Sequence, residues 1–121
     1  QLPAKACVVS GNPERLQIAL ENLCYNALSF TPPEGVITLS LEEKGNFAQI
    51  SVQDTGSGIA PEDLPHVFER GFTRRRNGGG DGLGLFMVWT IALEHGGTVE
   101  VSSQMGKGTI FTLHLPKRDA E

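Results

Sequence analysis

The sequence lacks the features of several protein classes. No apolar run approaches the roughly 18 residues that a membrane-spanning helix requires, and the first residues lack the charged and apolar regions of a signal peptide. There are two cysteines, Cys7 and Cys24, and their spacing indicates neither a metal site nor a disulfide framework. Basic residues are also few: 10 Lys and Arg against 14 Asp and Glu give a net charge of -4, which argues against a nucleic-acid binder. We therefore expect a soluble chain in a reducing compartment.

What is present fits one globular domain. The 121 residues are enough for one hydrophobic core, and 39% of them are hydrophobic. The 15 glycines bring the apolar-plus-glycine share to about half, which is the globular average and excludes disorder. We expect a single domain over residues 1–121, with a polar tail over residues 116–121.

Two long helices are predicted. Asn12 can cap the first helix and Pro13 suits its first turn. This helix should end near Phe30, because Pro32-Pro33 cannot continue it. The second helix should span residues 83–95, since two glycines follow where a left-handed backbone is needed.

Alternating side chains predict four strands. Residues 36–42 and 47–53 alternate with period two and form one hairpin, and residues 98–103 and 109–115 form a second. Residues 6–10 are a further, short β-prone run. Strands combined with two helices favour an α/β fold, a two-layer sandwich in which the helices pack on one face of the sheet.

Polar residues on otherwise apolar faces mark two candidate positions. Asn22 and Asn26 lie one turn apart on one side of the first helix. Their amides either line a functional site or form a solvated polar edge of the helix. Asp54 continues the inward parity of the strand over residues 47–53, so its carboxylate should face a cavity that contains a hydrogen-bond donor. The alternative for Asp54 is a turn residue at the strand end.

A glycine-rich segment, residues 77–85, leads directly into the second helix. Backbone N–H groups at a helix start form an anion site, and Arg70 and residues 74–76 add four cations just before it. A polyanion is therefore the expected ligand, unless the segment is only a flexible surface loop. A Walker A loop is excluded as the phosphate site. Such a loop requires Ser or Thr after its Gly-Lys pair, and in this chain Gly106-Lys107 is followed by Gly108.

In chain order these features resemble the ATP-binding catalytic domain of sensor histidine kinases. That domain is a branch of the Bergerat-fold (GHKL) ATPases, which include gyrase, Hsp90 and MutL. The resemblance covers almost the whole chain and rests on five segments. They are the N box (residues 22–27), the first G box (54–59), the F box (67–72), the second G box (80–85) and the ending (95–111). It implies a two-layer α/β sandwich with a mixed, mostly antiparallel sheet, helices on one face and a mobile ATP lid over residues 71–81.

The resemblance also implies a site for ATP and Mg²⁺. Asp54 would accept a hydrogen bond from the adenine amino group, and Gly58 would let the base approach. Asn26 would ligate Mg²⁺ through its amide oxygen, with Asn22 lining the same site. The implied ATP-binding positions are Asn22, Asn26, Asp54, Gly56, Gly58, Ile59, Phe68, Arg70, Gly80, Gly82, Leu83, Gly84, Leu85 and Thr109. No catalytic residue beyond these positioning groups is expected.

Four positions depart from the family pattern. Ser29 stands where these kinases often carry a cation near the phosphates, and Asp81 brings a carboxylate into the phosphate-binding turn. Asn12 replaces a common Asp, which is neutral because either residue caps a helix. Trp89 replaces an exposed polar residue, so it marks either a partner surface or ordinary partial burial.

By the same resemblance, this domain holds Mg-ATP and presents it to a histidine on a separate helical dimerisation and phosphoacceptor domain. It would act in two-component signal transduction, with a response regulator as an indirect partner. His66, His95 and His114 look unsuited as acceptors. We expect the isolated domain to be monomeric and cytoplasmic, as part of a membrane-anchored sensor.

Three other functions remain open. A Bergerat ATPase would hydrolyse ATP, but its N-box glutamate is replaced by Asn22, and Glu21 points about 100° around the helix. A serine kinase of the anti-sigma type shares the ATP site and differs in its acceptor. A degenerate docking domain would retain the fold without turnover, and Ser29 and Asp81 motivate this alternative.

Overall fold

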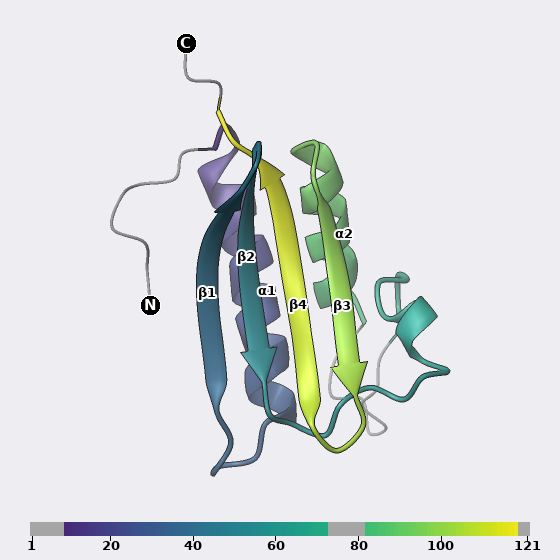
Figure 1. Ribbon diagram of the computed structural model, residues 1–121. Coiled ribbons are helices and arrows are strands. Elements are labelled where there is room, and N and C mark those ends of the chain that lie inside the picture. The colour runs from purple at the N-terminus through teal and green to yellow at the C-terminus, as the bar shows by residue number, and fades with distance from the viewer. Residues whose placement is uncertain (1–8, 73–81, 119–121) are drawn as a thin grey trace.

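The computed structural model describes residues 9–72 and 82–118, which form a sheet with helices on one side (Figure 1). The helices are α1 (Pro13–Phe30), the short 3-10 helix η1 (Leu64–His66) and α2 (Gly84–Glu94). The strands are β1 (Ile37–Lys44), β2 (Phe47–Asp54), β3 (Thr98–Gln104) and β4 (Gly108–Pro116). Both predicted long helices and both predicted hairpins are therefore confirmed, with bounds that differ by a residue or two.

The four strands form one sheet in the order β1-β2-β4-β3. β1 pairs with β2 and β3 pairs with β4, as the two hairpins require, and β2 pairs with β4 to join the hairpins. All three pairings are antiparallel, so the mixed character implied by the family resemblance is not found in residues 9–72 and 82–118. Most of the β-prone run over residues 6–10 lies outside these ranges, but Val9 forms an antiparallel bridge with Lys117.

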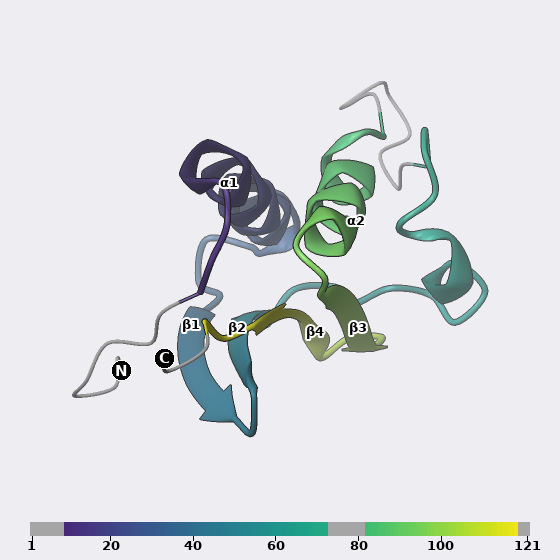
Figure 2. The same cartoon turned by 90° about the horizontal axis from the view of Figure 1, so that it is seen from above.

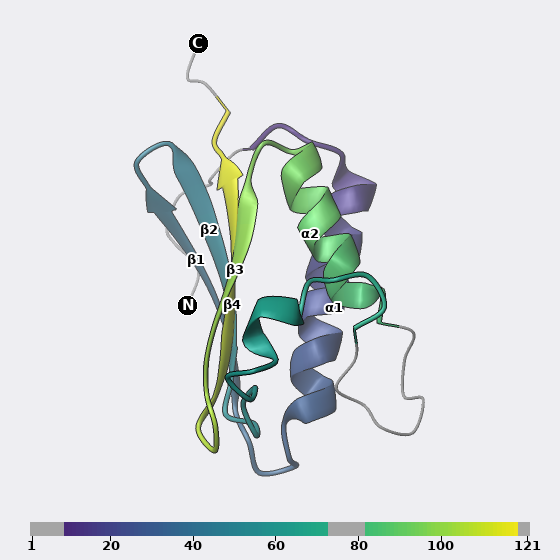
Figure 3. The same ribbon diagram turned by 90° about the vertical axis from the view of Figure 1, so that its right-hand side faces the viewer.

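Both long helices cover the same face of the sheet, with residues 55–72 running beside α2 (Figures 2 and 3). Residues spaced three or four apart bury one side of each helix, such as Leu23 in α1 and Val88 and Ile91 in α2. They pack against inward residues of the sheet, including Val52 and Phe111. Each of these buried side chains stabilises the fold by about 2 kcal/mol. The predicted two-layer α/β sandwich is confirmed.

The start of α1 follows from its local sequence. The Asn12 side chain accepts a hydrogen bond from the backbone N–H of Arg15 at 3.1 Å, and Pro13 occupies the first turn. The helix ends at Phe30 because Thr31, which precedes Pro32, has an extended backbone. No helix in the described ranges is long and apolar enough to cross a bilayer.

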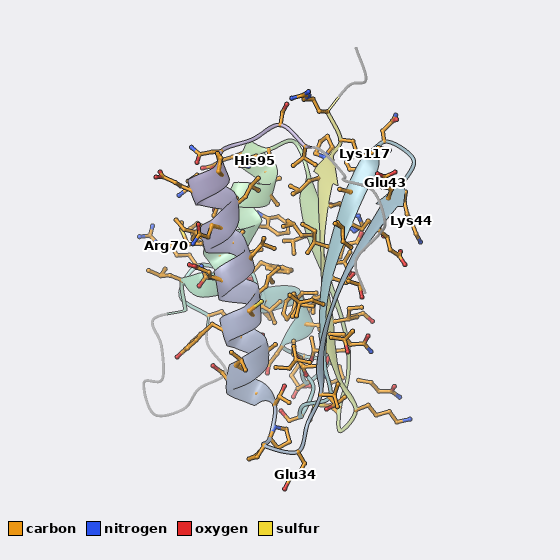
Figure 4. The ribbon with its side chains drawn as sticks, turned by 90° about the vertical axis from the view of Figure 1, so that its left-hand side faces the viewer. Glu34, Glu43, Lys44, Arg70, His95 and Lys117 are labelled. Atoms are coloured by element: carbon orange, nitrogen blue, oxygen red, sulfur yellow. The ribbon has the colours of Figure 1, made fainter. Side chains whose placement is uncertain are left out.

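A clasp of side chains joins the start of α1 to the end of α2. Arg15 donates two hydrogen bonds to the Glu94 carboxylate, from Nε at 3.1 Å and from Nη2 at 2.8 Å. His95 Nε2 accepts from the Asn12 backbone N–H at 3.0 Å, and His95 Nδ1 donates to the Ile91 carbonyl at 2.8 Å. Figure 4 shows His95 at this end of the molecule, remote from Glu34. We call these residues, Asn12, Arg15, Glu94 and His95, the helix clasp.

The end of the chain is more structured than predicted. β4 continues to Pro116, and Lys117 donates its backbone N–H to the Asn46 carbonyl at 2.7 Å. The first residues of the predicted polar tail, 116–121, therefore belong to the sheet, while residues 119–121 lie outside the described ranges.

Candidate functional site

Two buried polar side chains lie on neighbouring strands. Asp54 ends β2 and Thr109 stands near the start of β4, and the two residues are register partners in the β2–β4 pair. Each is only 5% exposed, and no other charged or polar residue in the described ranges is buried to this degree. The inward position of Asp54 confirms the parity argument from the sequence. β2 ends and β4 begins at the same end of the sheet (Figure 1), so Asp54 and Thr109 lie together at this end. We call these two residues the polar floor.

The Asp54 carboxylate accepts one hydrogen bond within the described part of the chain. The backbone N–H of Gly56 donates to Oδ1 at 2.8 Å, which is the turn contact that the sequence left open. Asp54 therefore caps the turn and also faces inward, and the cavity that the sequence places before its carboxylate stays a prediction. A buried carboxylate with one neutral partner is costly, so Oδ2 is suited to a further donor from a ligand.

The turn after β2 is held against the β3–β4 turn. Gly58 has a φ of +81°, and an added Cβ would lie 2.5 Å from the Gln104 carbonyl oxygen. The Gly106 N–H donates to the Ser57 carbonyl at 2.9 Å, and Ile59 is buried in the core. The close approach of the β3–β4 turn thus explains why position 58 requires glycine. The approach of a base to Gly58 stays a prediction. Gly56 is also buried, beside the Phe30 carbonyl.

The N box and the second G box meet where α2 begins. Asn22 Nδ2 donates to the Ile18 carbonyl at 2.9 Å, which turns Oδ1 toward α2. A Cβ added to Gly84 would lie 2.9 Å from this Oδ1, so a larger residue cannot occupy the position without a shift. The first N–H groups of an α-helix have no intrahelical partner, and no side chain from residues 9–72 or 82–118 is seen to cap α2. The start of α2 is therefore suited to an anion.

Asn26 lies one turn beyond Asn22 and is half-buried. The structure records no hydrogen bond from its amide to another described residue, so its oxygen can bind a hard cation. No group of three or more His, Cys, Asp or Glu in residues 9–72 and 82–118 could hold a metal ion. An amide oxygen is a ligand that Mg²⁺ accepts alongside phosphate oxygens, and the role of Asn26 as a metal ligand stays a prediction. The Ser29 hydroxyl donates to the Tyr25 carbonyl at 2.9 Å and adds no cation.

Aromatic contacts hold the F box against α2. The ring of Phe68 lies 5.4 Å from that of Trp89 and 6.0 Å from that of Phe111. The guanidinium of Arg70 lies 6.0 Å from the centre of the Phe86 ring. Trp89 is 40% exposed, so its packing on Phe68 agrees with ordinary partial burial. The contacts of Phe68 and Arg70 are structural, and their part in ATP binding stays a prediction.

The predicted lid, residues 71–81, lies outside the described ranges except for Gly71 and Phe72. The Gly71 N–H donates to the Gly82 carbonyl at 3.0 Å, which joins the two ends of this segment. Leu83 caps α2 through its carbonyl, which accepts from Met87 at 2.8 Å, and Leu85 follows half-buried in the first turn. The predicted contributions of Gly80, Asp81 and residues 74–76 also lie outside the described ranges.

One residue of this site was not predicted. Ser103 Oγ accepts from the Ile59 N–H at 2.7 Å, and it contacts the Gly108 carbonyl at 3.0 Å and Thr109 Oγ1 at 2.9 Å. The available signal was the one that identified Asp54, because Ser103 shares the inward parity of Val99 and Val101 on β3. A polar residue on that face requires partners.

The fold and the site together define a class of protein. An antiparallel sheet with helices on one face carries a buried carboxylate at the end of a strand, and the start of α2 is suited to an anion. The chain matches the family described as histidine kinase-, DNA gyrase B- and HSP90-like ATPase over residues 11–119. It belongs to that family.

Among sequence relatives, the chain is 40% identical over 122 residues to the sensor histidine kinase CusS of Escherichia coli O157:H7. The match covers 98% of this chain and 25% of CusS, so the chain spans about a quarter of the length of this relative.

Solved structures of histidine kinases share the fold. The mycobacterial sensor histidine kinase MprB aligns with a TM-score of 0.83 and 33% identity, over 91% of this chain and 77% of that one. Full-length ShkA in complex with AMPPNP aligns with a TM-score of 0.85 and 30% identity, over 98% of this chain and 25% of that one. The fold is therefore that of histidine kinase catalytic domains.

Proposed function

We propose that this domain binds Mg-ATP with the adenine near Asp54 and Thr109 and the phosphates at the start of α2. The observation that carries the proposal is the closeness of Asn22 Oδ1 to Gly84, where an added Cβ would lie 2.9 Å away, so that the N box lies beside the first-turn amides of α2. The buried Asp54 carboxylate gives the other end of the site an acceptor for an amino group. The similarity to ShkA, which was solved with AMPPNP, supports the same class of ligand.

Catalysis by such a site consists mainly of positioning. The first-turn amides of α2 donate to phosphate oxygens, and the helix dipole favours the same charge. Asp54 orients the base at the opposite end. Asn22 and Asn26 supply amide oxygens on the α1 side, and bound Mg²⁺ would neutralise phosphate charge there. A nucleotide held at both ends presents its γ-phosphate in a fixed direction.

We further propose that the γ-phosphate passes to a histidine of a separate helical dimerisation and phosphoacceptor domain. The imidazole nitrogen bonds to phosphorus, the bond to the bridging oxygen breaks, and ADP leaves. A neutral imidazole is already a nucleophile near pH 7, so the site needs no strong general base. The N box fits this chemistry better than hydrolysis. Asn22 stands at its start, and the Glu21 carboxylate accepts from Gln17 Nε2 at 2.9 Å on the exposed side of α1.

The contacts of this chain's histidines support an acceptor elsewhere. Both ring nitrogens of His95 are engaged in the helix clasp. His66 Nδ1 pairs with Glu69 at 2.8 Å, and His114 lies in β4, where Gln49 Nε2 is 3.1 Å from Nδ1. Since the chain spans a quarter of CusS, the rest of such a protein has room for a helical domain. We propose that the isolated domain is monomeric, which sedimentation can check, and that it works in the cytoplasm, where ATP is available.

Phosphotransfer from γ-labelled ATP tests this function. The domain is mixed with the helical phosphoacceptor domain of a histidine kinase relative, and the label on that domain is followed over time. We expect acid-labile label on the acceptor and none after its histidine is replaced by alanine. Asn26→Ala should slow transfer at least about tenfold, because a metal ligand is lost. Lys44→Ala, at the exposed β1–β2 turn and therefore at the other end of the strands from Asp54, is the matched control and should leave the rate unchanged.

Other outcomes would assign other functions. Acid-stable label on serine would identify a serine kinase of the anti-sigma type. Release of free phosphate without transfer would identify an ATPase. Nucleotide binding with neither reaction would identify a docking domain.

A further inference from the structure

Ser103, Thr109 and Asp54 lie in a row across three strands. Ser103 of β3 is the register partner of Thr109 in β4, and Thr109 is the register partner of Asp54 in β2. Register partners in an antiparallel sheet place their side chains on the same face. This face is the one that the helices cover, because it also carries Val52, Phe111 and Val101. The row joins the proposed base-binding carboxylate to a hydroxyl two strands away.

The hydrogen bonds of Ser103 fix the direction of every proton around it. A serine hydroxyl has one proton to donate and two lone pairs. The Ile59 N–H can only donate, and it lies 2.7 Å from Oγ. The Gly108 carbonyl can only accept, and it lies 3.0 Å from Oγ. With the single serine proton used on Gly108, the remaining contact of 2.9 Å requires Thr109 to donate to Ser103.

This arrangement decides what Thr109 offers to a ligand. Its proton points along the row toward Ser103, so only lone pairs are left to face the side of Asp54. The Asp54 carboxylate is also an acceptor, and its one recorded donor is the Gly56 N–H. Asp54 and Thr109 therefore offer two acceptors, and no hydroxyl proton, to a ligand that lies against both. Such a surface suits a purine that carries an amino group at position 6 and disfavours one that carries a carbonyl there.

Ser103 also fixes the turn that follows β2. Its hydrogen bond to Ile59 lies directly after Gly58, where the chain packs on the Gln104 carbonyl. One hydroxyl thus links the turn, the start of β4 and the floor of the site. Ser102, the neighbouring residue, is exposed on the opposite face and is the register partner of Ile110.

We propose that Ser103 is a positioning residue that sets base specificity, by committing the Thr109 proton away from the nucleotide and by holding the Ile59 amide in place. The inference rests on the proposed function, since it requires the base to lie near Asp54 and Thr109.

Nucleotide affinities test the proposal. Calorimetry in the presence of Mg²⁺ gives the Kd of ATP and of ITP, in which a carbonyl replaces the 6-amino group. We compare the parent with Ser103→Ala, with Ser103→Thr, which retains a hydroxyl, and with Ser102→Ala as the matched control. Loss of the Ser103 hydroxyl should weaken ATP binding on the order of tenfold and lower the ratio of ATP to ITP affinity by a similar factor. Ser103→Thr and Ser102→Ala should keep the parent ratio.

The outcomes separate the two proposals. If Ser103→Ala weakens both nucleotides equally, Ser103 is only structural and the specificity role is wrong. The same conclusion follows if the variant binds both as the parent does. If the parent binds neither nucleotide, the proposed function itself fails, and the role of Ser103 fails with it. A thermal melt of each variant shows whether a loss of binding reflects a loss of folded protein.

Discussion

At the scale of single residues, the site depends on where side-chain oxygens point. Parity along β2 was enough to predict that Asp54 faces inward, because the period of a strand is local information. The contact between Asn22 and Gly84 could not be predicted in this way, since it depends on how α1 and α2 lie together. Ser103 has the same inward parity as Asp54. Burying a hydroxyl costs much less free energy than burying a charge, so parity alone indicates a functional role less strongly for Ser103.

The close contact between Gly84 and Asn22 gives a residue-scale prediction. Gly84→Ala should weaken Mg-ATP binding about threefold or more, because the added Cβ would lie 2.9 Å from Asn22 Oδ1 and one of the two must shift. Stability should change little, since alanine is the better helix former and offsets part of the strain. Calorimetry and a thermal melt measure the two effects.

A second variant separates this contact from a general disturbance of α2. In an Asn22→Ala background the obstacle is absent, so Gly84→Ala should have a smaller effect on binding there than in the parent. Equal effects in both backgrounds would show that the contact is not the cause.

At the scale of elements, local patterns predicted the helices and the hairpins but not how they combine. Alternation identifies each hairpin, yet the pairing of β2 with β4 joins residues that are far apart in sequence. That pairing brings Asp54 beside Thr109 and so forms the polar floor of the site. The helix clasp is likewise a contact between distant segments, for which neither helix gives a signal alone.

The helix clasp gives a prediction of pH dependence. The hydrogen bonds from Arg15 lower the pKa of Glu94 below its ordinary value of 4.5, and the positive charge of Arg15 acts in the same direction. A lowered pKa in the folded state contributes stability that is present above the ordinary pKa and is lost as the pH falls through the lowered one. Glu94→Gln should therefore lower the Tm at pH 7, by only about 2 °C because the pair is exposed.

This difference in Tm should shrink as the pH is taken below 4.5, where the Glu94 carboxylate of the parent also becomes neutral. Glu34→Gln at the opposite end of the molecule is the control and should show no such trend. A difference for Glu94→Gln that is constant from pH 7 to pH 3 would mean that the ion pair does not stabilise the fold.

At the scale of the whole molecule, the clasp and the site lie in different parts of one sandwich. α2 links them, since Gly84 at its start meets Asn22 and Glu94 at its end meets Arg15. The two-layer architecture follows from composition and pattern, because amphipathic helices and alternating strands bury their apolar faces against each other.

The central claim is that one site holds adenine at Asp54 and phosphates at the start of α2. Titration of the domain with an ATP analogue, with and without Mg²⁺, tests it most directly. We expect the parent to bind at micromolar to millimolar Kd, with tighter binding in Mg²⁺, and Asp54→Asn to lose at least about tenfold in affinity. Gln53→Asn, on the exposed face of the same strand, should bind as the parent does. No binding by the parent at millimolar nucleotide, or equal binding by Asp54→Asn, would contradict the account.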